Sequence, residues 1–373
     1  MKKCCVLFFL SFLMTANSFG QKDKQFYFKI NGTINADTGT VYLYFYRDYI
    51  PNKTKELVSH VRDNKFSFSG YIPEPQAVNI FFDDRYMSSD FIIEKGEQTI
   101  SINTDTTRKV PVVLNKIMTN EYPKYEAYFE KIQGMWRRFY QKVDSFNTLY
   151  NRQLPKTVKL NIDKEYSILC DLDNKTLLQY SQERPTSHIA FWRLIRTMTW
   201  GYEPILDSIY NSFTSELKNG YAGRVLDKKL KNGRQLSVGK QFPLLQSVNR
   251  NNEKFSPTIF LNNKFTLVDF WYSGCSPCRA QFNRLKDLYK QFHTKGFEIV
   301  GISVDKDTHK KEWEDSIINE KLSWKQYWDM NGKEAKRLSI HGFPTNFLID
   351  STGKIIVNNI SLEELEELLS KSL

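Results

Sequence analysis

The stretch FTLVDFWYSGCSPCRAQFNRL, residues 265–285, constrains the fold of this chain more than any other. Its apolar run over residues 265–271 predicts a buried strand, and the apolar residues that recur every three positions near its end predict a helix. Between them lies the motif Cys-Ser-Pro-Cys, residues 275–278. A CxxC motif between a strand and a helix is typical of a redox pair, because one helical turn brings the two sulfur atoms together.

The two cysteines of this motif are predicted to differ in reactivity. Cys275 would lie at the helix start, where unpaired N–H groups and the positive end of the helix dipole stabilise a thiolate. Cys278 would lie one turn further in and more buried. Pro277 fits the first helical turn, where its missing N–H is not needed. The sequence therefore predicts Cys275 as the nucleophile and Cys278 as the resolving cysteine.

Other uses of a CxxC motif fit the sequence less well. A zinc site needs a second Cys/His pair, and none follows at zinc-finger spacing. A haem attachment needs His after the second Cys, where this chain has Arg279. A purely structural disulfide remains open as an alternative. The sequence thus predicts no metal and no cofactor.

Together with later motifs, this stretch resembles the exported thioredoxin-like thiol–disulfide oxidoreductases of the TlpA/ResA type. The shared segments are VDFW and CSPCR, then GFPTNFLID at residues 342–350 and TGK at residues 352–354. The resemblance covers residues 237–373. It implies an α/β thioredoxin-like C-terminal domain that exchanges disulfides with exported proteins, as a reductase.

The resemblance also assigns roles to further residues. Asp269, six residues before the first Cys, matches an aspartate that carries protons for the buried cysteine, and burial is expected to raise its pKa. A structural role is the alternative for this carboxylate. Pro344 matches a cis-proline that faces the disulfide. The residues expected to contact the substrate are Trp271, Phe343 and Thr345.

Three residues near the motif depart from the family pattern or leave a question open. Gln281 stands where related proteins often carry glutamate, and it cannot take up a proton. Gly274 precedes the first Cys where thioredoxins often have Trp, which leaves the substrate contacts near Cys275 in doubt. His341 could influence the thiolate charge but is expected to be a surface residue of a loop.

The N-terminus predicts export. Residues 1–20 read as a secretory signal peptide, with Lys2 and Lys3 before an apolar run over residues 4–14 that is too short to span a bilayer comfortably. An uncleaved anchor is the alternative. We therefore expect an exported, periplasmic or cell-envelope protein. Its expected partners are exported protein thiols or disulfides and a membrane or periplasmic redox donor.

The net charge of +11 is concentrated in the middle of the chain. Residues 113–236 carry 20 basic and 13 acidic side chains, a net charge of +7. The basic residues are scattered among helical turns rather than clustered with aromatic residues. For an exported protein this favours a solvated face or an acidic partner surface, and nucleic acid is not an expected partner.

Residues 25–112 are predicted to form a small antiparallel β domain, similar to a sandwich. Short runs of β-branched and aromatic residues are bounded there by Gly, Asn and Asp. Residues 63–64 and 94–97 look like hairpin turns. The domain resembles the small β domain of unknown function that often precedes exported thioredoxin-like domains. The tyrosines expected to pack across its strands are Tyr42, Tyr44, Tyr46 and Tyr49.

Residues 113–236 have the periodicity of four to five helices. Cys170 is left over once the CxxC pair is formed, and its apolar helical context predicts a buried small hydrophobe. His188 has no companion Cys or His nearby, so a metal role is not expected. The tryptophans expected in the core of this region are Trp136, Trp192 and Trp200.

Three other functions compete with disulfide exchange. A peroxiredoxin-like peroxidase shares the fold, but its motif has Ser or Thr three residues before the reactive Cys, where this chain has Tyr272. A thiol-based metal or haem-pathway chaperone of this fold usually has wider Cys spacing and a His. A binding protein with a vestigial redox domain is disfavoured by the intact CxxC motif.

Overall fold

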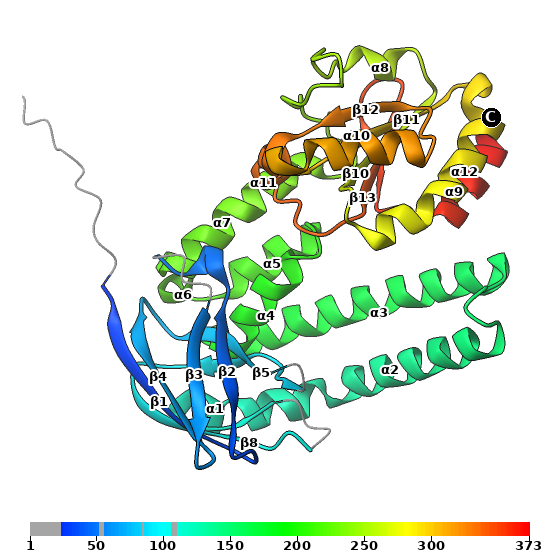
Figure 1. Ribbon diagram of the computed structural model, residues 1–373. Helices are drawn as coiled ribbons and strands as arrows, with labels where there is room; N and C mark the ends of the chain where they lie inside the picture. The colour runs from blue at the N-terminus through cyan, green and yellow to red at the C-terminus, as the bar shows by residue number, and fades with distance from the viewer. Residues whose placement is uncertain (1–23, 52–55, 84–85, 106–109) are drawn as a thin grey trace, which may run out of the picture.

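The computed structural model describes residues 24–51, 56–83, 86–105 and 110–373. The chain passes through a β domain, a helical region and a C-terminal α/β domain, in that order (Figure 1). The β domain and the helical region share one hydrophobic core, whereas the C-terminal domain has a core on each face of its own sheet. The predicted signal peptide, residues 1–20, lies outside the described residues.

The described part of the β domain contains the strands β1 (Phe26–Ile34), β2 (Thr38–Phe45), β3 (Glu56–Arg62), β4 (Lys65–Ile72), β5 (Gln76–Phe82), β6 (Tyr86–Met87), β7 (Phe91–Ile93), β8 (Gly96–Ile102) and β9 (Val112–Leu114). Hydrogen bonds join them in the order β6-β5-β2-β3-β4-β1-β8-β9, with β7 beside β5. All pairs are antiparallel except β1 with β8.

The sheet is weakly joined between β3 and β4, because only one pair of facing residues, Arg62 and Lys65, is found between these strands in the described part of the chain. The rings of Phe28 in β1 and Phe45 in β2 lie 6.3 Å apart, although two strands separate β1 from β2 in the sheet. The two halves therefore fold over each other like the layers of a sandwich, with the apolar side chains between them.

The two predicted hairpins have different outcomes. Asp63 and Asn64 connect β3 and β4 with positive φ angles of 50° and 61°, which suit a tight two-residue hairpin turn. The hairpin predicted at residues 94–97 is wrong, because β7 pairs with β5 and β8 pairs with β1 and β9. The turn was recognisable from local sequence, but the partners of the two strands were not.

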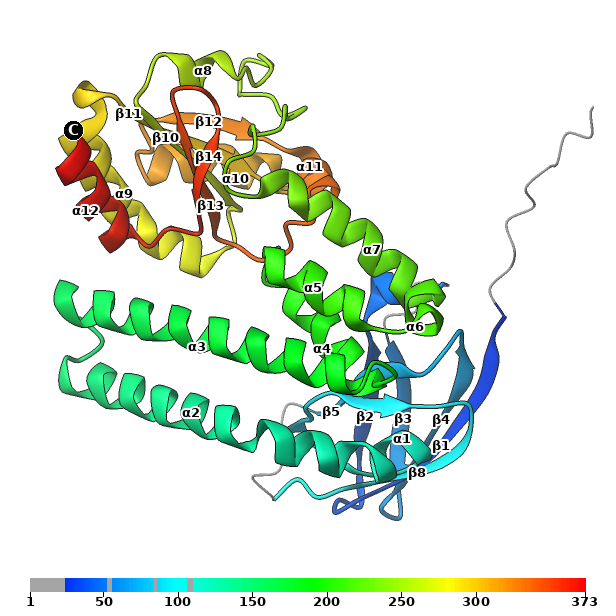
Figure 2. The same ribbon diagram turned by 180° about the vertical axis from the view of Figure 1, so that it is seen from behind.

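The helical region consists of α1 (Lys116–Asn120), α2 (Tyr122–Leu149), α3 (Lys156–Glu183), α4 (His188–Met198), α5 (Pro204–Ser212), α6 (Ser215–Asn219) and α7 (Tyr221–Gly233), followed by the 3₁₀ turn η2 (Arg234–Leu236). Helices α2 and α3 form a long antiparallel arm that extends from the β domain alongside the C-terminal domain (Figure 2). Aromatic rings hold the arm together, among them Trp136 and Tyr166, 5.5 Å apart.

Aromatic residues also join the β domain to the helices. Trp192 of α4 is buried, and its ring lies 5.7 Å from that of Tyr46 and 5.9 Å from that of Tyr49. Tyr42 and Tyr44 stack on each other along β2. Trp200, in contrast, does not belong to the core: its side chain is 78% exposed in the loop between α4 and α5. The expectation for Trp200 is therefore wrong, because the chain turns outward there.

The C-terminal domain, all of which is described, has a five-stranded sheet in the order β12-β11-β10-β13-β14. Its elements are α8 (Thr258–Leu261), β10 (Phe265–Trp271), α9 (Ser276–Phe292), β11 (Phe297–Ser303), α10 (Lys310–Asn319), β12 (Lys325–Trp328), α11 (Lys333–Arg337), β13 (Thr345–Asp350), β14 (Ile355–Asn358) and α12 (Leu362–Ser372). The first three strands of this order run parallel to one another. β13 pairs antiparallel with β10, and β14 pairs antiparallel with β13, as expected for a thioredoxin-like domain. Helices α9, α10 and α12 cover one face of the sheet, and α8 and α11 cover the other.

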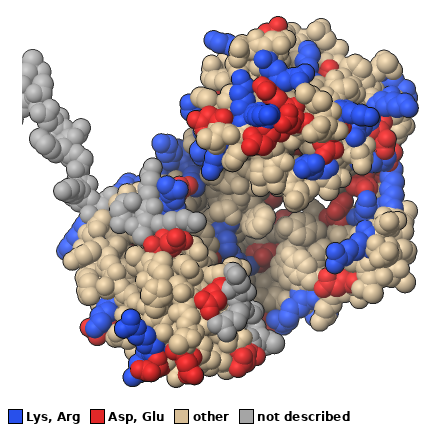
Figure 3. Space-filling model, in the orientation of Figure 1, with Lys and Arg blue, Asp and Glu red and all other residues tan. Residues whose placement is uncertain are grey.

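Ion pairs connect the helical region to the domain on either side of it. Lys229 of α7 pairs with Asp48 in the β domain at 2.7 Å. On the far side, the arm contacts α12 through Lys159 with Glu363, at 3.3 Å, and through Lys156 with Glu366. The arm thus touches the C-terminal domain at its tip, and a hollow remains between the two (Figure 3). Among the described helices, none combines the length and apolar character that a membrane span requires.

Candidate active site

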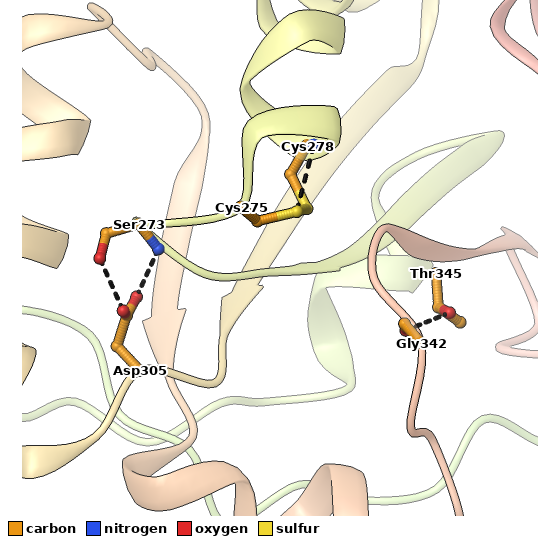
Figure 4. Close-up of a disulfide and its surroundings, with 6 residues drawn as sticks. All are labelled: Ser273, Cys275, Cys278, Asp305, Gly342 and Thr345. Carbon is orange, nitrogen blue, oxygen red and sulfur yellow. Dashed lines mark hydrogen bonds between the residues drawn. A yellow bond between two sulfur atoms is a disulfide. The ribbon is translucent and has the colours of Figure 1, made fainter. Parts of the chain in front are cut away.

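The two cysteines of the motif form a disulfide at the start of α9 (Figure 4). Cys275 is the N-cap residue, and its Sγ accepts a hydrogen bond from the backbone N–H of Cys278 at 3.2 Å. The following 17 residues are helical, with Pro277 in the first turn as predicted. A sulfur in this position is the nearest acceptor for the unpaired N–H groups of the helix, which favours negative charge on Cys275 once the disulfide is reduced.

Both cysteines are buried in the oxidised protein, each with 1% of its surface exposed. The sequence predicted that Cys278 would be the more buried of the two, whereas the exposed fractions are equal. Phe343 packs on the apolar cluster that contains both cysteines, and its ring lies 5.8 Å from that of Tyr272, three residues before Cys275.

Asp305, which the sequence did not single out, holds the loop before the motif in place. Its carboxylate accepts hydrogen bonds from the backbone N–H and the hydroxyl of Ser273, at 2.9 and 2.7 Å (Figure 4). The hydroxyl of Ser303 donates a third bond, at 2.6 Å. Asp305 is buried just after the end of β11, the strand next to β10. The only local signal for this role is a carboxylate directly after a buried strand.

We expect Asp305→Ala to lower the free energy of unfolding by about 3 kcal/mol, because half-buried polar groups of Ser273 and the buried hydroxyl of Ser303 lose their hydrogen bonds to the carboxylate. Chemical denaturation monitored by tryptophan fluorescence measures this change. Asp315→Ala, at an exposed position of α10, is the matched control and should change stability by less than roughly 0.5 kcal/mol. Equal stability of the two variants would contradict the role assigned to Asp305.

The loop after α11 carries the predicted cis-proline. The Phe343–Pro344 peptide bond is cis, as the sequence motif predicted. Thr345 follows, and its hydroxyl donates a hydrogen bond to the carbonyl oxygen of Gly342 at 2.8 Å, which closes the loop on itself (Figure 4). Phe343, Pro344 and Thr345 are all half-buried and lie at one edge of the site. We call residues 341–345 the cis-proline loop.

Asp269 lies within β10 and is buried. Its neighbours two positions away, Leu267 and Trp271, belong to the apolar cluster that contains both cysteines, so the alternation of the strand directs Asp269 to the same side. Burial raises the pKa of its carboxyl group to about 7. Its Oδ1 atom has no hydrogen-bond partner among the described residues. These are the properties of a group that can exchange a proton near neutral pH.

Trp271 and His341 lie in surroundings other than those expected from the sequence. Trp271 is 1% exposed, donates from Nε1 to the side-chain oxygen of Gln326 at 3.1 Å and packs edge-on against Phe282. It lies in the core of the domain, and its contact with a substrate stays a prediction. His341 is not on the surface, because it is half-buried between the C-terminal domain and α7. Burial and the nearby Lys229 lower the pKa of His341 to about 4, so its ring is neutral at physiological pH.

The remaining predicted residues add no metal chemistry. Burial lowers the pKa of His188, and the described residues contain no group of three or more His, Cys, Asp or Glu that could hold a metal ion. Cys170 is half-buried in α3, and burial raises the pKa of its thiol, so it is a poor nucleophile beside Cys275. Gln281 is half-buried one turn after Cys278.

The start of α9, which carries the motif, lies on the side of the C-terminal domain that faces the helical region (Figures 1 and 2). The C-terminal end of α9 is fixed near the chain terminus, since Lys264 bonds through its backbone N–H to Gly296 and through its side chain to Ser372. The opposite end of α9, which carries the motif, points toward α3 and α5 (Figures 1 and 2). The cis-proline loop reaches the same region, because a Cβ atom on Gly342 would lie 3.9 Å from the carbonyl oxygen of Thr199.

Two family models match the chain. Residues 237–367 match the family described as Redoxin, and residues 28–134 match a domain of unknown function, DUF4369. The second match extends past the β domain into α2, in keeping with the core that these parts share.

Proteins similar to this chain are thiol–disulfide enzymes by name. "Thiol-disulfide oxidoreductase ResA" of Bacillus thuringiensis subsp. konkukian is 28% identical over 141 residues, which is 37% of this chain and 79% of that protein. "Thiol:disulfide interchange protein DsbE" of Yersinia pestis is 29% identical over 121 residues, 32% of this chain and 61% of that protein.

A solved structure is similar over the same share of the chain. The thiol–disulfide oxidoreductase from Bacteroides fragilis NCTC 9343 is 36% identical and covers 36% of this chain and all of its own, with a TM-score of 0.33. The thioredoxin-like fold, the disulfide and the names of the similar proteins all indicate thiol–disulfide chemistry. The C-terminal domain is therefore a thioredoxin-like Redoxin domain similar to the thiol–disulfide oxidoreductases of the TlpA/ResA type, and the part of the chain before it matches a domain of unknown function.

Proposed function

We propose that this chain is an exported reductase that acts on disulfides of exported proteins through Cys275 and Cys278. The observation that carries the proposal is the position of Cys275 as N-cap of α9, where its Sγ already accepts a helix N–H. A thiolate held by such a contact is stabilised and available for attack on a disulfide. The predicted signal peptide supports export.

The reaction proceeds through a mixed disulfide. The Cys275 thiolate forms a bond to one sulfur of the substrate disulfide, and the other substrate sulfur leaves as a thiolate. The Cys278 thiolate then attacks the sulfur of Cys275 and releases the second substrate thiolate. The substrate gains two electrons, and the protein keeps the disulfide seen between the two cysteines. A membrane or periplasmic dithiol donor returns the electrons.

Asp269 would accept the proton that Cys278 loses. The thiol must lose its proton before the second step, and a carboxyl group with a pKa of about 7 can accept it near neutral pH. Gln281, one turn beyond Cys278, offers no such group. Phe343 and Thr345, beside the cis bond of Pro344, would contact the substrate chain along its backbone.

Reduction of insulin by dithiothreitol, followed as turbidity, tests the proposed activity. The reduced protein should accelerate precipitation, and the rate should depend on Cys275. Peroxide consumption and metal titration, run on the same preparation, test the two competing functions. A protein that consumes peroxide rapidly but leaves insulin intact would overturn the proposal. Cell fractionation of a strain that expresses the full chain tests export.

A further inference from the structure

Three neighbouring strands of the C-terminal sheet place Asp269, Gly301 and Gln326 in one row. Asp269 in β10 pairs with Gly301 in β11, and Gly301 pairs with Gln326 in β12 (Figure 1). Trp324 and Trp328, two positions before and after Gln326, belong to the apolar cluster that contains both cysteines. Because side chains alternate along a strand, Gln326 points to the face of the sheet that Asp269 and the disulfide share.

Gly301 leaves the space that the side chain of Gln326 occupies. A Cβ atom on Gly301 would lie 2.2 Å from Oε1 of Gln326 and 2.8 Å from its Nε2, both far closer than a real Cβ contact. The amide group of Gln326 therefore lies directly over the middle strand of the row. Neighbouring strands are about 4.8 Å apart, so this amide comes within one strand spacing of Asp269. Any residue larger than glycine at position 301 would close this route.

Trp271 determines which way round the amide of Gln326 lies. The indole Nε1–H of Trp271 donates to Oε1 of Gln326 at 3.1 Å. An indole nitrogen only donates, so the amide oxygen must face it, and Nε2 is the end left over. This Nε2 is buried and has no acceptor among the described residues, and Oδ1 of Asp269 is buried without a donor. One face of the sheet thus holds a spare donor and a spare acceptor, although buried polar groups are nearly always paired.

No other charged side chain faces Asp269 in the described part of the chain. Burial is the only cause of its raised pKa. Asn346, its partner in β13, uses both ends of its amide on the backbone just before α12. The buried residues of α9, α10 and α12 carry no charge, and Cys278 of α9 is in the disulfide. Tyr289 of α9 and Glu298, near the start of β11, interact with each other. Gln326 is therefore the neighbour with a free donor.

We propose that Gln326 is a positioning residue for the disulfide exchange: its Nε2 donates a hydrogen bond to the carboxylate of Asp269 when that group is ionised. The last torsion of an aspartate is soft, so the carboxyl group can turn an oxygen toward the amide. A hydrogen bond to the charged form favours that form. Gln326 would thus keep part of Asp269 ionised within an apolar core, ready to accept the proton of Cys278. This inference deepens the proposed function and rests on it for the role of Asp269.

The oxidised full-length protein provides the first test, because its paired cysteines do not titrate. The carboxyl ¹³C resonance of labelled Asp269, assigned by its loss in Asp269→Asn, reports the ionisation. Gln326→Met keeps the length of the side chain and removes the donor. We expect this variant to raise the pKa of Asp269 by about one unit, a tenfold change in proton affinity. An equal or lower pKa in the variant would overturn the proposal.

Thr266→Val is the matched control for this titration. Thr266 also lies in β10, and its buried Oγ1 has no partner among the described residues. Val268, two positions away, belongs to the cluster on the opposite face of the sheet, so Thr266 points away from Asp269. Its replacement should leave the pKa of Asp269 as it is.

The natural protein offers a second readout, which needs no variant at position 326 and so does not depend on its folding. One Nε2 proton of Gln326, identified by its proximity to the indole proton of Trp271, should move downfield in the proton NMR spectrum as Asp269 ionises, with the same midpoint. In Asp269→Asn this proton should not titrate. A Gln326 proton that is indifferent to the ionisation of Asp269 would overturn the hydrogen bond.

Insulin reduction by the reduced proteins connects the hydrogen bond to the reaction. The rising limb of the rate against pH should move upward by about one unit in Gln326→Met. In the Asp269→Asn background the same substitution should leave the pH profile unchanged, because the group on which it acts is gone. An equal shift in both backgrounds would contradict an action through Asp269. A hydrogen bond seen by NMR in a protein that reduces no disulfide would overturn the proposed function, while the contact between Gln326 and Asp269 would stand.

Discussion

Replacement of Cys275 by serine is expected to reduce disulfide exchange by roughly a thousandfold or more, because the variant lacks the nucleophile that starts the reaction. The hydroxyl of serine remains protonated where a thiol would ionise, so the same hydrogen bond from Cys278 N–H cannot activate it. Insulin reduction measures the loss directly. The fold should be retained, since serine is also a favourable N-cap residue.

Cys278→Ser should behave differently, because the first step remains and the second is blocked. The variant should accumulate a mixed disulfide between Cys275 and its substrate, visible on non-reducing gels and identifiable by mass spectrometry. Cys170→Ser is the matched control and should retain the activity of the natural protein. Accumulation of the mixed disulfide at Cys170 instead, or equal alkylation rates of the reduced Cys275 and Cys278, would refute the assignment of the nucleophile.

Asp269→Asn is expected to stabilise the oxidised protein, in which the paired cysteines do not titrate. At pH below the ordinary value of 3.8, the carboxyl group is protonated in both the folded and the unfolded chain. As the pH rises toward about 7, the unfolded chain loses this proton and the buried group keeps it, so the free energy of unfolding falls. At pH 7 and above, the variant should be more stable by up to roughly 4 kcal/mol.

The same substitution should slow disulfide exchange at neutral pH by about a hundredfold, because asparagine cannot accept a proton from Cys278. Denaturation curves and insulin reduction across the pH range measure the two effects on one variant. Gln281→Glu in the Asp269→Asn background should recover part of the rate. Asp315→Asn is the control for loss of a surface carboxylate. A variant with natural rates at every pH would show that Asp269 is only structural.

The catalytic motif was predictable because its signals are local. The strand over residues 265–271 and the N-cap position of Cys275 each depend on a few neighbouring residues. The cis bond before Pro344 came from the resemblance rather than from any physical pattern in the sequence. The burial of Asp269 followed from its position in an apolar strand.

The remaining features depend on contacts between distant segments. Asp305 lies 32 residues from Ser273, so no local pattern relates the two. The strands β7 and β8 adjoin the same short turn but pair elsewhere in the sheet. Trp271 and Trp200 look alike in sequence, yet one lies in a sheet covered on both faces and the other in an outward turn. His341 is half-buried, and Lys229, more than 100 residues earlier in α7, is one cause of the lowered pKa of its ring.

The arm of α2 and α3 borders the hollow beside the C-terminal domain and closes it at the tip of the arm (Figure 3). Its tip meets α12 through Lys156 and Lys159, and both lysines keep much of their surface in water. Such ion pairs weaken as the ionic strength rises. The contact between the arm and the C-terminal domain is therefore expected to weaken at high salt, and with it the restraint that holds the arm beside that domain.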